Sequence, residues 1–228
     1  MSARRLLLLF LLASPLLAGA EGGSCTRLDD SSKDEDPDPT SPAQPFLDAF
    51  NGGLVLWRLT VPIPNYRMTA GNPFPSMEVG SQTTLPTGGL TVRKFDITNG
   101  LVVEADVFSQ APTANTTADP RYWVGLSDED DPTGTVGVAA GVYVDAGNTL
   151  HFQVNGADIG TTQGPSRGAW HRFTTTIRAD RVVEFRVDGQ LLMTGGSVDS
   201  LYLVRSIEAC GIGFPERPQF DNVGGRLP

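Results

Sequence analysis

The chain has 228 residues, of which 39% are hydrophobic, with 26 glycines, 17 prolines and a formal net charge of −9. Once a leader is removed, that length holds one large β domain of roughly 170–180 residues, enough to bury a core without metals or disulfides. The acidic balance repels phosphate backbones and anionic lipid, which excludes nucleic acid as an expected partner and leaves a lipid anchor as the sole expected membrane attachment.

Residues 1–20 have the pattern of a signal peptide. Arg4 and Arg5 precede the apolar run LLLLFLLASPLL, which is too short to span a bilayer, and Ala18-Gly19-Ala20 is a small-residue cleavage site. Residues 21–45 are acidic, rich in proline and nearly free of apolar side chains, which predicts a disordered linker. We therefore expect an exported protein, either secreted or periplasmic or held at the cell surface by a lipid.

Two interpretations of Cys25 stay open. Gly22-Gly23-Ser24-Cys25 resembles a bacterial lipobox, although Gly22 stands where that motif usually has leucine, and lipidation at Cys25 would anchor the protein. Without lipidation, Cys25 can form a disulfide with Cys210 in an oxidising compartment. Plain secretion is favoured because the cysteine lies some distance past the apolar run. The sequon at Asn115 matters only in a eukaryotic secretory host, and the leader and linker look bacterial.

The folded domain is expected over residues 46–228. Short runs of strand-forming residues alternate with turn signals every 8–12 residues and show no helical periodicity, which predicts an all-β, two-sheet antiparallel sandwich. The segment 62–75 is expected to be a loop. The expected strands are 46–50, 54–60, 76–80, 90–97, 101–109, 121–127, 136–145, 149–155, 201–207 and 220–225.

The clearest signal is the stretch 170–192, WHRFTTTIRADRVVEFRVDGQLL. Val183, Phe185 and Val187 alternate with charged residues, so this strand has one apolar face for the core and one polar face for solvent. A polar turn precedes it at 178–181, and Asp188-Gly189 ends it with a strong hairpin signal. An antiparallel meander is predicted here.

Several sequence blocks form a recognisable set: Asp48-Ala49-Phe50 with Trp57, Gly71-Asn72-Pro73 with Pro75-Ser76-Met77, LVVEADVF, WVGLSD, Trp170-His171 with Val187-Asp188-Gly189, and Phe220-Asp221-Asn222-Val223. Over residues 46–226 this set resembles the concanavalin A-like lectin/glucanase superfamily, including laminin-G-like bacterial surface domains. The resemblance implies a jelly roll of two curved antiparallel sheets, with ligands on the concave face or at its rim.

Glu104 and Asp106 lie two apart in VVEADVF and so project from one face of a strand. The superfamily's glucanases carry a Glu-x-Asp-x-Glu motif here, with one glutamate as nucleophile and the other as acid/base. Phe108 occupies the position of the second glutamate, so the favoured interpretation is a solvated carboxylate pair, with a ligand-binding role as the alternative.

A binding face is predicted on three strands if these are neighbours. Alternation places Trp123 and Tyr143 opposite the apolar side chains, above a floor of small residues, with His151, Gln153 and Asn155 as a polar edge. Aromatic rings with amide and imidazole partners suit a sugar. The alternative is that Trp123 and Tyr143 cap the sheet beneath a long loop.

Metal and nucleophile chemistry have weaker candidates. The acidic run 128–131 does not match an EF-hand, and Asp48 and Asp221 are candidates for a shared structural calcium because jelly-roll termini pair. Two cysteines and two histidines support no zinc site, and no G-x-S-x-G elbow or Ser/His/Asp arrangement is evident. His171 is expected to be structural.

The sequence therefore predicts a non-catalytic binding module whose partner is a polysaccharide or other glycan. Two alternatives remain. One is a glycoside hydrolase, either a degenerate glucanase or an enzyme similar to the bacterial 3-keto-glycoside hydrolases. The segment FNGGLVLW of this chain resembles the opening of the latter domains. The other is a purely structural or adhesive surface protein.

Overall fold

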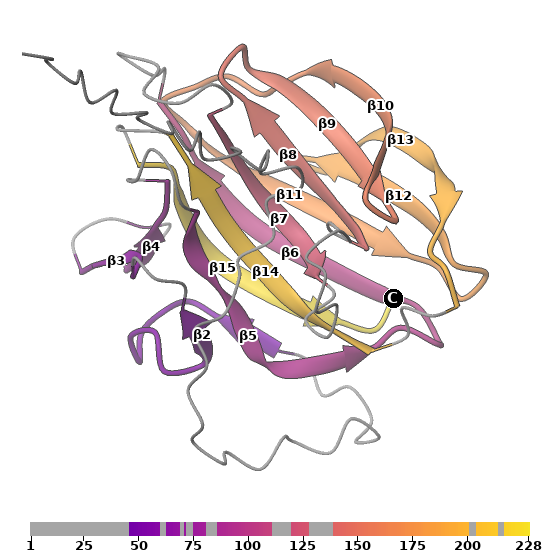
Figure 1. Ribbon diagram of the computed structural model, residues 1–228, viewed down its shortest axis with the longest axis horizontal. Helices are drawn as coiled ribbons and strands as arrows, with labels where there is room; N and C mark the ends of the chain where they lie inside the picture. Colours follow the sequence, from indigo (N-terminus) through magenta and orange to yellow (C-terminus); the bar gives the residue numbers. More distant parts are fainter. Residues whose placement is uncertain are drawn as a thin grey trace, which may run out of the picture.

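The computed structural model describes residues 46–59, 63–68, 71, 75–80, 86–110, 120–127, 139–200, 204–213 and 217–228. The predicted signal peptide, the linker with Cys25, the sequon at Asn115 and the acidic run 128–131 lie outside the described residues. Within these ranges the secondary structure consists of strands in two antiparallel sheets (Figure 1). The same ranges contain no helix long and apolar enough to cross a membrane.

The first sheet has eight strands in the order β13-β12-β11-β6-β15-β4-β3, with β1 paired to β15. Its strands are β1 (Phe46–Asp48), β3 (Asn65–Arg67), β4 (Ser76–Glu78), β6 (Leu101–Phe108), β11 (Trp170–Ile177), β12 (Val182–Val187), β13 (Gln190–Ser197) and β15 (Gln219–Arg226). Because β1 pairs with β15, the predicted meeting of the domain's two ends is confirmed.

The second sheet has seven strands in the order β10-β9-β8-β7-β14-β5-β2. Its strands are β2 (Trp57–Leu59), β5 (Thr87–Asp96), β7 (Arg121–Ser127), β8 (Ala140–Asp145), β9 (Thr149–Val154), β10 (Ala157–Gln163) and β14 (Val204–Ile212). Two strands differ from the prediction. β3, in the first sheet, lies in the segment 62–75 that was expected to be a loop, and β10, in the second sheet, was not predicted.

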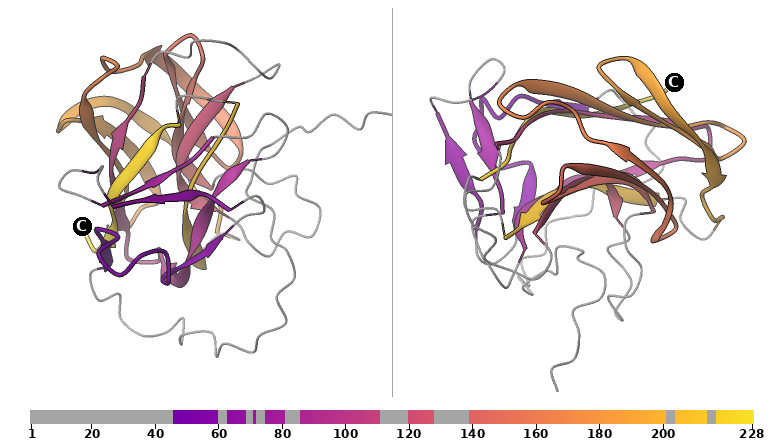
Figure 2. Two further views of the ribbon diagram at one scale, coloured as in Figure 1. Left: turned by 90° about the vertical axis from the view of Figure 1, so that its left-hand side faces the viewer. Right: turned by 90° about the horizontal axis from the view of Figure 1, so that it is seen from above.

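The two sheets pack face to face as curved layers (Figure 2). Period-two alternation sends apolar side chains of both sheets into a single core, in which Phe152 of the seven-stranded sheet packs on Phe185 of the eight-stranded sheet at 5.2 Å between ring centroids. Tyr122 and Phe220 make a second contact of this kind at 6.4 Å. Full burial of one such ring contributes about 1.5–3 kcal/mol. This is the predicted all-β sandwich.

The 170–192 meander forms as predicted. Phe185 pairs with Thr175, and Val183 and Phe185 are both buried in the core. The turn between β11 and β12 closes through the Arg178 N–H, which donates to the Val182 carbonyl, while Arg181 takes a positive φ of 68°. The stretch is a structural hairpin that forms one end of the eight-stranded sheet.

Candidate functional site

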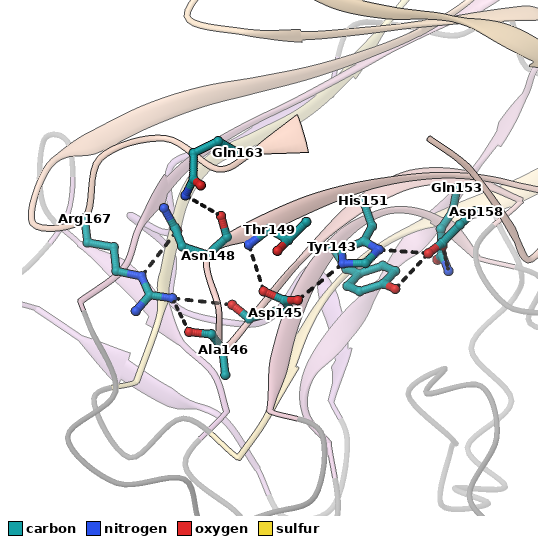
Figure 3. Close-up of polar contacts among 10 residues, drawn as sticks. All are labelled: Tyr143, Asp145, Ala146, Asn148, Thr149, His151, Gln153, Asp158, Gln163 and Arg167. Atoms are coloured by element: carbon teal, nitrogen blue, oxygen red, sulfur yellow. Dashed lines mark hydrogen bonds and ion pairs between the residues drawn. The ribbon is translucent and has the colours of Figure 1, made fainter. Parts of the chain in front are cut away.

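The outer face of the seven-stranded sheet carries a group of polar side chains that contact one another. β8 pairs with β9 so that Tyr143 lies opposite His151, and β9 pairs with β10 so that His151 lies opposite Thr161 and Gln153 opposite Asp158. The predicted adjacency of these strands is therefore confirmed for β7, β8 and β9. We call Tyr143, Asp145, His151, Gln153 and Asp158 the polar cluster (Figure 3).

Asp158, on the edge strand β10, joins the other members of the polar cluster. Its Oδ2 accepts hydrogen bonds from the Tyr143 hydroxyl at 3.0 Å and from His151 Nδ1 at 2.8 Å, and its Oδ1 accepts one from Gln153 Nε2 at 3.0 Å. The side chain of Asp158 is 37% exposed, so these bonds orient the carboxylate without removing it from solvent. A pre-oriented carboxylate retains lone pairs for a ligand hydroxyl.

His151 lies between two carboxylates. Its Nε2 is 3.4 Å from Asp145 Oδ2, on the side opposite Asp158. Its ring also stacks on the phenol of Tyr143, with centroids 4.1 Å apart and planes 12° apart, and the Arg121 guanidinium lies over the same phenol at 5.7 Å. The Tyr143 ring is therefore engaged by neighbouring side chains, and recognition at this face would be chiefly polar.

The turn between β8 and β9 sets the position of Asp145. The Thr149 N–H donates to Asp145 Oδ1 at 2.7 Å, closing the turn through the side chain. Arg167, from the segment between β10 and β11, donates Nη2 to the Ala146 carbonyl at 2.8 Å and Nε to Asn148 Oδ1 at 3.2 Å (Figure 3). A guanidinium fork that bonds two points of a turn restrains it more firmly than a single ammonium can.

Trp123 lies on the predicted face but does not offer an open platform. It is 3% exposed and forms a second apolar group with Leu90 and Cys210, against which Tyr143 and Ile212 pack. Among the described residues its indole Nε1 has no hydrogen-bond partner, which leaves a buried donor unsatisfied there. Trp123 is thus a covered residue at the border of the polar cluster, in keeping with the alternative interpretation of a capped sheet.

Asn155 has a different role from the one predicted for it. It occupies the turn between β9 and β10 with a positive φ of 52°, a conformation that asparagine tolerates better than most residues. Its Nδ2 donates to the Ser197 carbonyl at 2.9 Å, and its Oδ1 accepts from the Asp199 N–H at 3.0 Å. Asn155 therefore fastens this turn to the end of β13 in the other sheet.

Glu104 and Asp106 lie on β6, in the eight-stranded sheet, and so do not share a surface with the polar cluster. Arg172 Nε and Nη2 contact the two oxygens of Asp106 at 2.7 and 2.8 Å, and this hydrogen bond raises the pKa of Arg172 further. Glu104 Oε1 accepts a bond from Arg226 at 2.8 Å. Both carboxylates serve ion pairs between strands, because β6 lies between β11 and β15.

Asp48 and Asp221, the predicted calcium ligands, both accept hydrogen bonds from neighbouring protein groups. Asp48 accepts the Phe50 N–H on Oδ1 and the Trp57 indole N–H on Oδ2, each at 2.7 Å, so it orders the turn after β1. Asp221 is fully buried and accepts the Asn222 N–H at 2.7 Å. Among the described residues no group of three or more potential ligands could hold a metal ion.

His171 brings together a serine and an aspartate that sequence reasoning did not connect. Its Nδ1 is 2.7 Å from Asp188 Oδ2, and its Nε2 is 3.1 Å from Ser166 Oγ and 2.8 Å from the Ser166 carbonyl. The Ser166 carbonyl only accepts and is nearer to Nε2 than the hydroxyl is, so a proton on Nε2 would be donated to this carbonyl and Nε2 would then not act as a base toward the hydroxyl. Burial raises the pKa of Asp188, but hydrogen bonds from His171 and the Arg172 N–H outweigh it and lower that pKa. Through these contacts His171 joins the start of β11 to Asp188 and to Ser166.

No protein-family profile matches the chain, and no curated protein matches its sequence. Among solved structures, the Emp47p carbohydrate recognition domain matches with a TM-score of 0.58 and 13% identity, covering 80% of this chain and 94% of that one. The metal-free Emp46p carbohydrate recognition domain matches at 0.51 with 10% identity, covering 75% and 87%. A sialidase matches at 0.57 with 11% identity, covering 80% of this chain but 18% of the sialidase.

The matching structures and the strand topology of this chain indicate the same architecture. Two antiparallel sheets of eight and seven strands pack as a sandwich, and the Emp47p carbohydrate recognition domain and part of a sialidase are similar in fold despite low sequence identity. Such similarity establishes the fold alone. The chain has the concanavalin A-like jelly-roll fold, as the sequence blocks had indicated.

Proposed function

We propose that the protein is an exported, non-catalytic module that binds a glycan through the polar cluster on its seven-stranded sheet. The observation that carries the proposal is the convergence of Tyr143, His151 and Gln153 on the Asp158 carboxylate, all on one sheet face. Sugar hydroxyls are recognised by carboxylates, amides and imidazoles held in fixed positions, since ordering these groups beforehand reduces the entropic cost of binding.

The exposure of the polar cluster suits a shallow binding surface. The side chains of Asp145, His151 and Asp158 are 30%, 17% and 37% exposed, so each is partly ordered and partly open to a ligand. The fold supports the same proposal, since the matching Emp46p and Emp47p domains are described as carbohydrate recognition domains. Export is supported by the predicted leader and by the disulfide at Cys210, because disulfides persist in oxidising compartments.

Affinity electrophoresis and a glycan array would test the proposal. Asp158→Asn keeps the shape of the side chain but removes its charge, and we expect it to weaken glycan binding by about tenfold, the effect of one charge-assisted hydrogen bond. Asp180→Asn is the matched control, because Asp180 is an exposed carboxylate in the turn between β11 and β12 of the other sheet. A wild-type protein that retains no glycan, or an Asp158→Asn variant that binds equally well, would overturn the proposal.

For the glucanase alternative, the sequence suggested Glu104 and Asp106, and both carboxylates are engaged in ion pairs. Glu104 and Asp106 are paired with Arg226 and Arg172, and Phe108, at the position of the second glutamate, packs against Trp170 with ring centroids 5.5 Å apart and planes tilted by 41°. Incubation of the purified protein with laminarin, lichenan and 3-keto-disaccharides is the direct comparison. Turnover abolished by Glu104→Gln would establish the enzyme and displace the binding module.

A further inference from the structure

An apolar patch lies beside the polar cluster on the outer face of the seven-stranded sheet. It consists of Leu90 on β5, Cys210 on β14 and Trp123 on β7, and Cys210 and Trp123 are directly opposite each other in the register. These residues are 5%, 0% and 3% exposed. Glu208, which has the same orientation two residues before Cys210, is also fully buried.

Burial on this face requires a covering segment. The core of the sandwich lies on the other side of the sheet, where Val124 and Ala209 point. An indole on an outer sheet face stays accessible unless chain lies across it, because its neighbours on adjacent strands stand beside it and not above it. The burial of Trp123 and Cys210 therefore indicates that a segment of the chain packs over the patch.

The chemistry of Cys210 identifies that segment. Cys210 is disulfide-bonded, and no described cysteine is free. The sequence contains two cysteines, and the other is Cys25 in the segment that precedes the domain. With one chain in the structure, elimination leaves Cys25 as the partner.

We infer that the N-terminal segment around Cys25 docks on the Leu90–Trp123–Cys210 patch through a Cys25–Cys210 disulfide. The thiols of Cys25 and Cys210 lose two electrons and two protons, and the disulfide of an exchanging oxidoreductase takes them up to become a dithiol. The Cys25 sulfur is consumed in this bond, so it carries no lipid thioether. The mature chain therefore begins before Cys25, as cleavage after Ala20 would give.

Docking also defines the extent of the proposed glycan site, a consequence that rests on the proposed function. Because Tyr143 packs against the Leu90–Trp123–Cys210 patch, a segment docked on that patch would border the polar cluster on its Trp123 side. The disulfide itself is independent of any ligand. A failure to bind glycan would leave the docking intact, and a missing disulfide would leave the polar cluster intact.

Peptide mapping of the exported full-length protein under non-reducing conditions is the first test. We expect a peptide pair linked through Cys25 and Cys210 that separates on reduction. A lipid on Cys25, or a Cys210–Cys210 link between two copies, overturns the inference.

Accessibility of Trp123 is the second test. Reduction of the wild-type protein under native conditions, and separately the Cys25→Ser variant, should increase acrylamide quenching of Trp123 fluorescence and expose the Cys210 thiol to a maleimide. The background from Trp57 and Trp170 is removed by the same measurement on Trp123→Phe. Quenching and thiol protection that stay unchanged in both samples, with circular dichroism also unchanged, mean that another segment covers the patch, and the docking is then wrong.

Discussion

The imidazole of His151 lies flat against the phenol of Tyr143, with ring centroids 4.1 Å apart, and both side chains contact the same oxygen of Asp158. Stacking fixes the plane of each ring, and the shared carboxylate fixes the direction of their polar atoms. The three side chains come from three adjacent strands, so the geometry depends on the sheet register and not on a loop. A site built on strands is positioned more rigidly than one built on loops.

The substitution Tyr143→Phe distinguishes the role of the Tyr143 hydroxyl from that of its ring, which stacks on His151. The variant keeps the ring on His151 but loses the hydrogen bond to Asp158, which costs about 1 kcal/mol or less because the group is solvent-accessible. We expect near-normal thermal stability and a loss of glycan affinity of roughly fivefold, since the carboxylate is less firmly oriented. Isothermal titration calorimetry and differential scanning calorimetry measure the two effects. An unchanged affinity would show that the hydroxyl does not order the site.

Arg167→Lys tests whether the polar cluster depends on the guanidinium fork at the β8–β9 turn. Lysine keeps the charge but cannot bond Ala146 O and Asn148 Oδ1 together, so the turn that carries Asp145 should loosen. The expected result is about 1–2 kcal/mol lower unfolding free energy, by chemical denaturation, and weaker glycan binding. Arg178→Lys, at an exposed ion pair in the other sheet, should change neither quantity.

We expect the free energy of unfolding to fall at alkaline pH because of the buried phenol of Tyr122. Desolvation raises the pKa of its phenol to about 12, although the hydrogen bond to Ser109 and the charge of Arg167 act in the opposite direction. In the unfolded chain the phenol ionises near pH 10. The stability that the neutral, buried phenol contributes is therefore fully present below about pH 10 and is lost as the pH rises toward 12. Denaturant titrations should show wild-type stability falling by roughly 2–3 kcal/mol over this window. Tyr122→Phe should remove that part of the slope, and an identical slope in both proteins would contradict the assignment.

Arg172→Met tests the ion pair on the eight-stranded sheet. The substitution leaves the nearly buried Asp106 carboxylate with less compensation, and we expect about 1–3 kcal/mol of destabilisation. Glycan binding should not change, because the pair lies on the opposite sheet from the polar cluster. The exposed Arg178–Asp180 pair provides the comparison, since Arg178→Met should cost less than about 0.5 kcal/mol.

The candidate site was partly predictable from the sequence. Alternation correctly placed Tyr143, His151 and Gln153 on one face, since strand parity is a local property. Asp158 was missed because β10 reads ADIGTTQ, an edge strand with few apolar residues and mostly exposed positions, which carries almost no periodic signal. The two-residue turn at Asn155-Gly156, just after β9, was the signal that could have revealed it.

By itself the sequence determined the all-β class, the 170–192 hairpin, the pairing of the domain's two ends and the face on which each strand's side chains lie, because these follow from local alternation, turn chemistry and the resemblance of sequence blocks. Only the tertiary structure decided which strands share a sheet. Sheet order depends on contacts between residues far apart in the chain, and it separated Glu104 and Asp106 from Tyr143 and His151. The same long-range packing buried Trp123 and joined Asp158 to the site, so the polar cluster exists only in the folded sandwich.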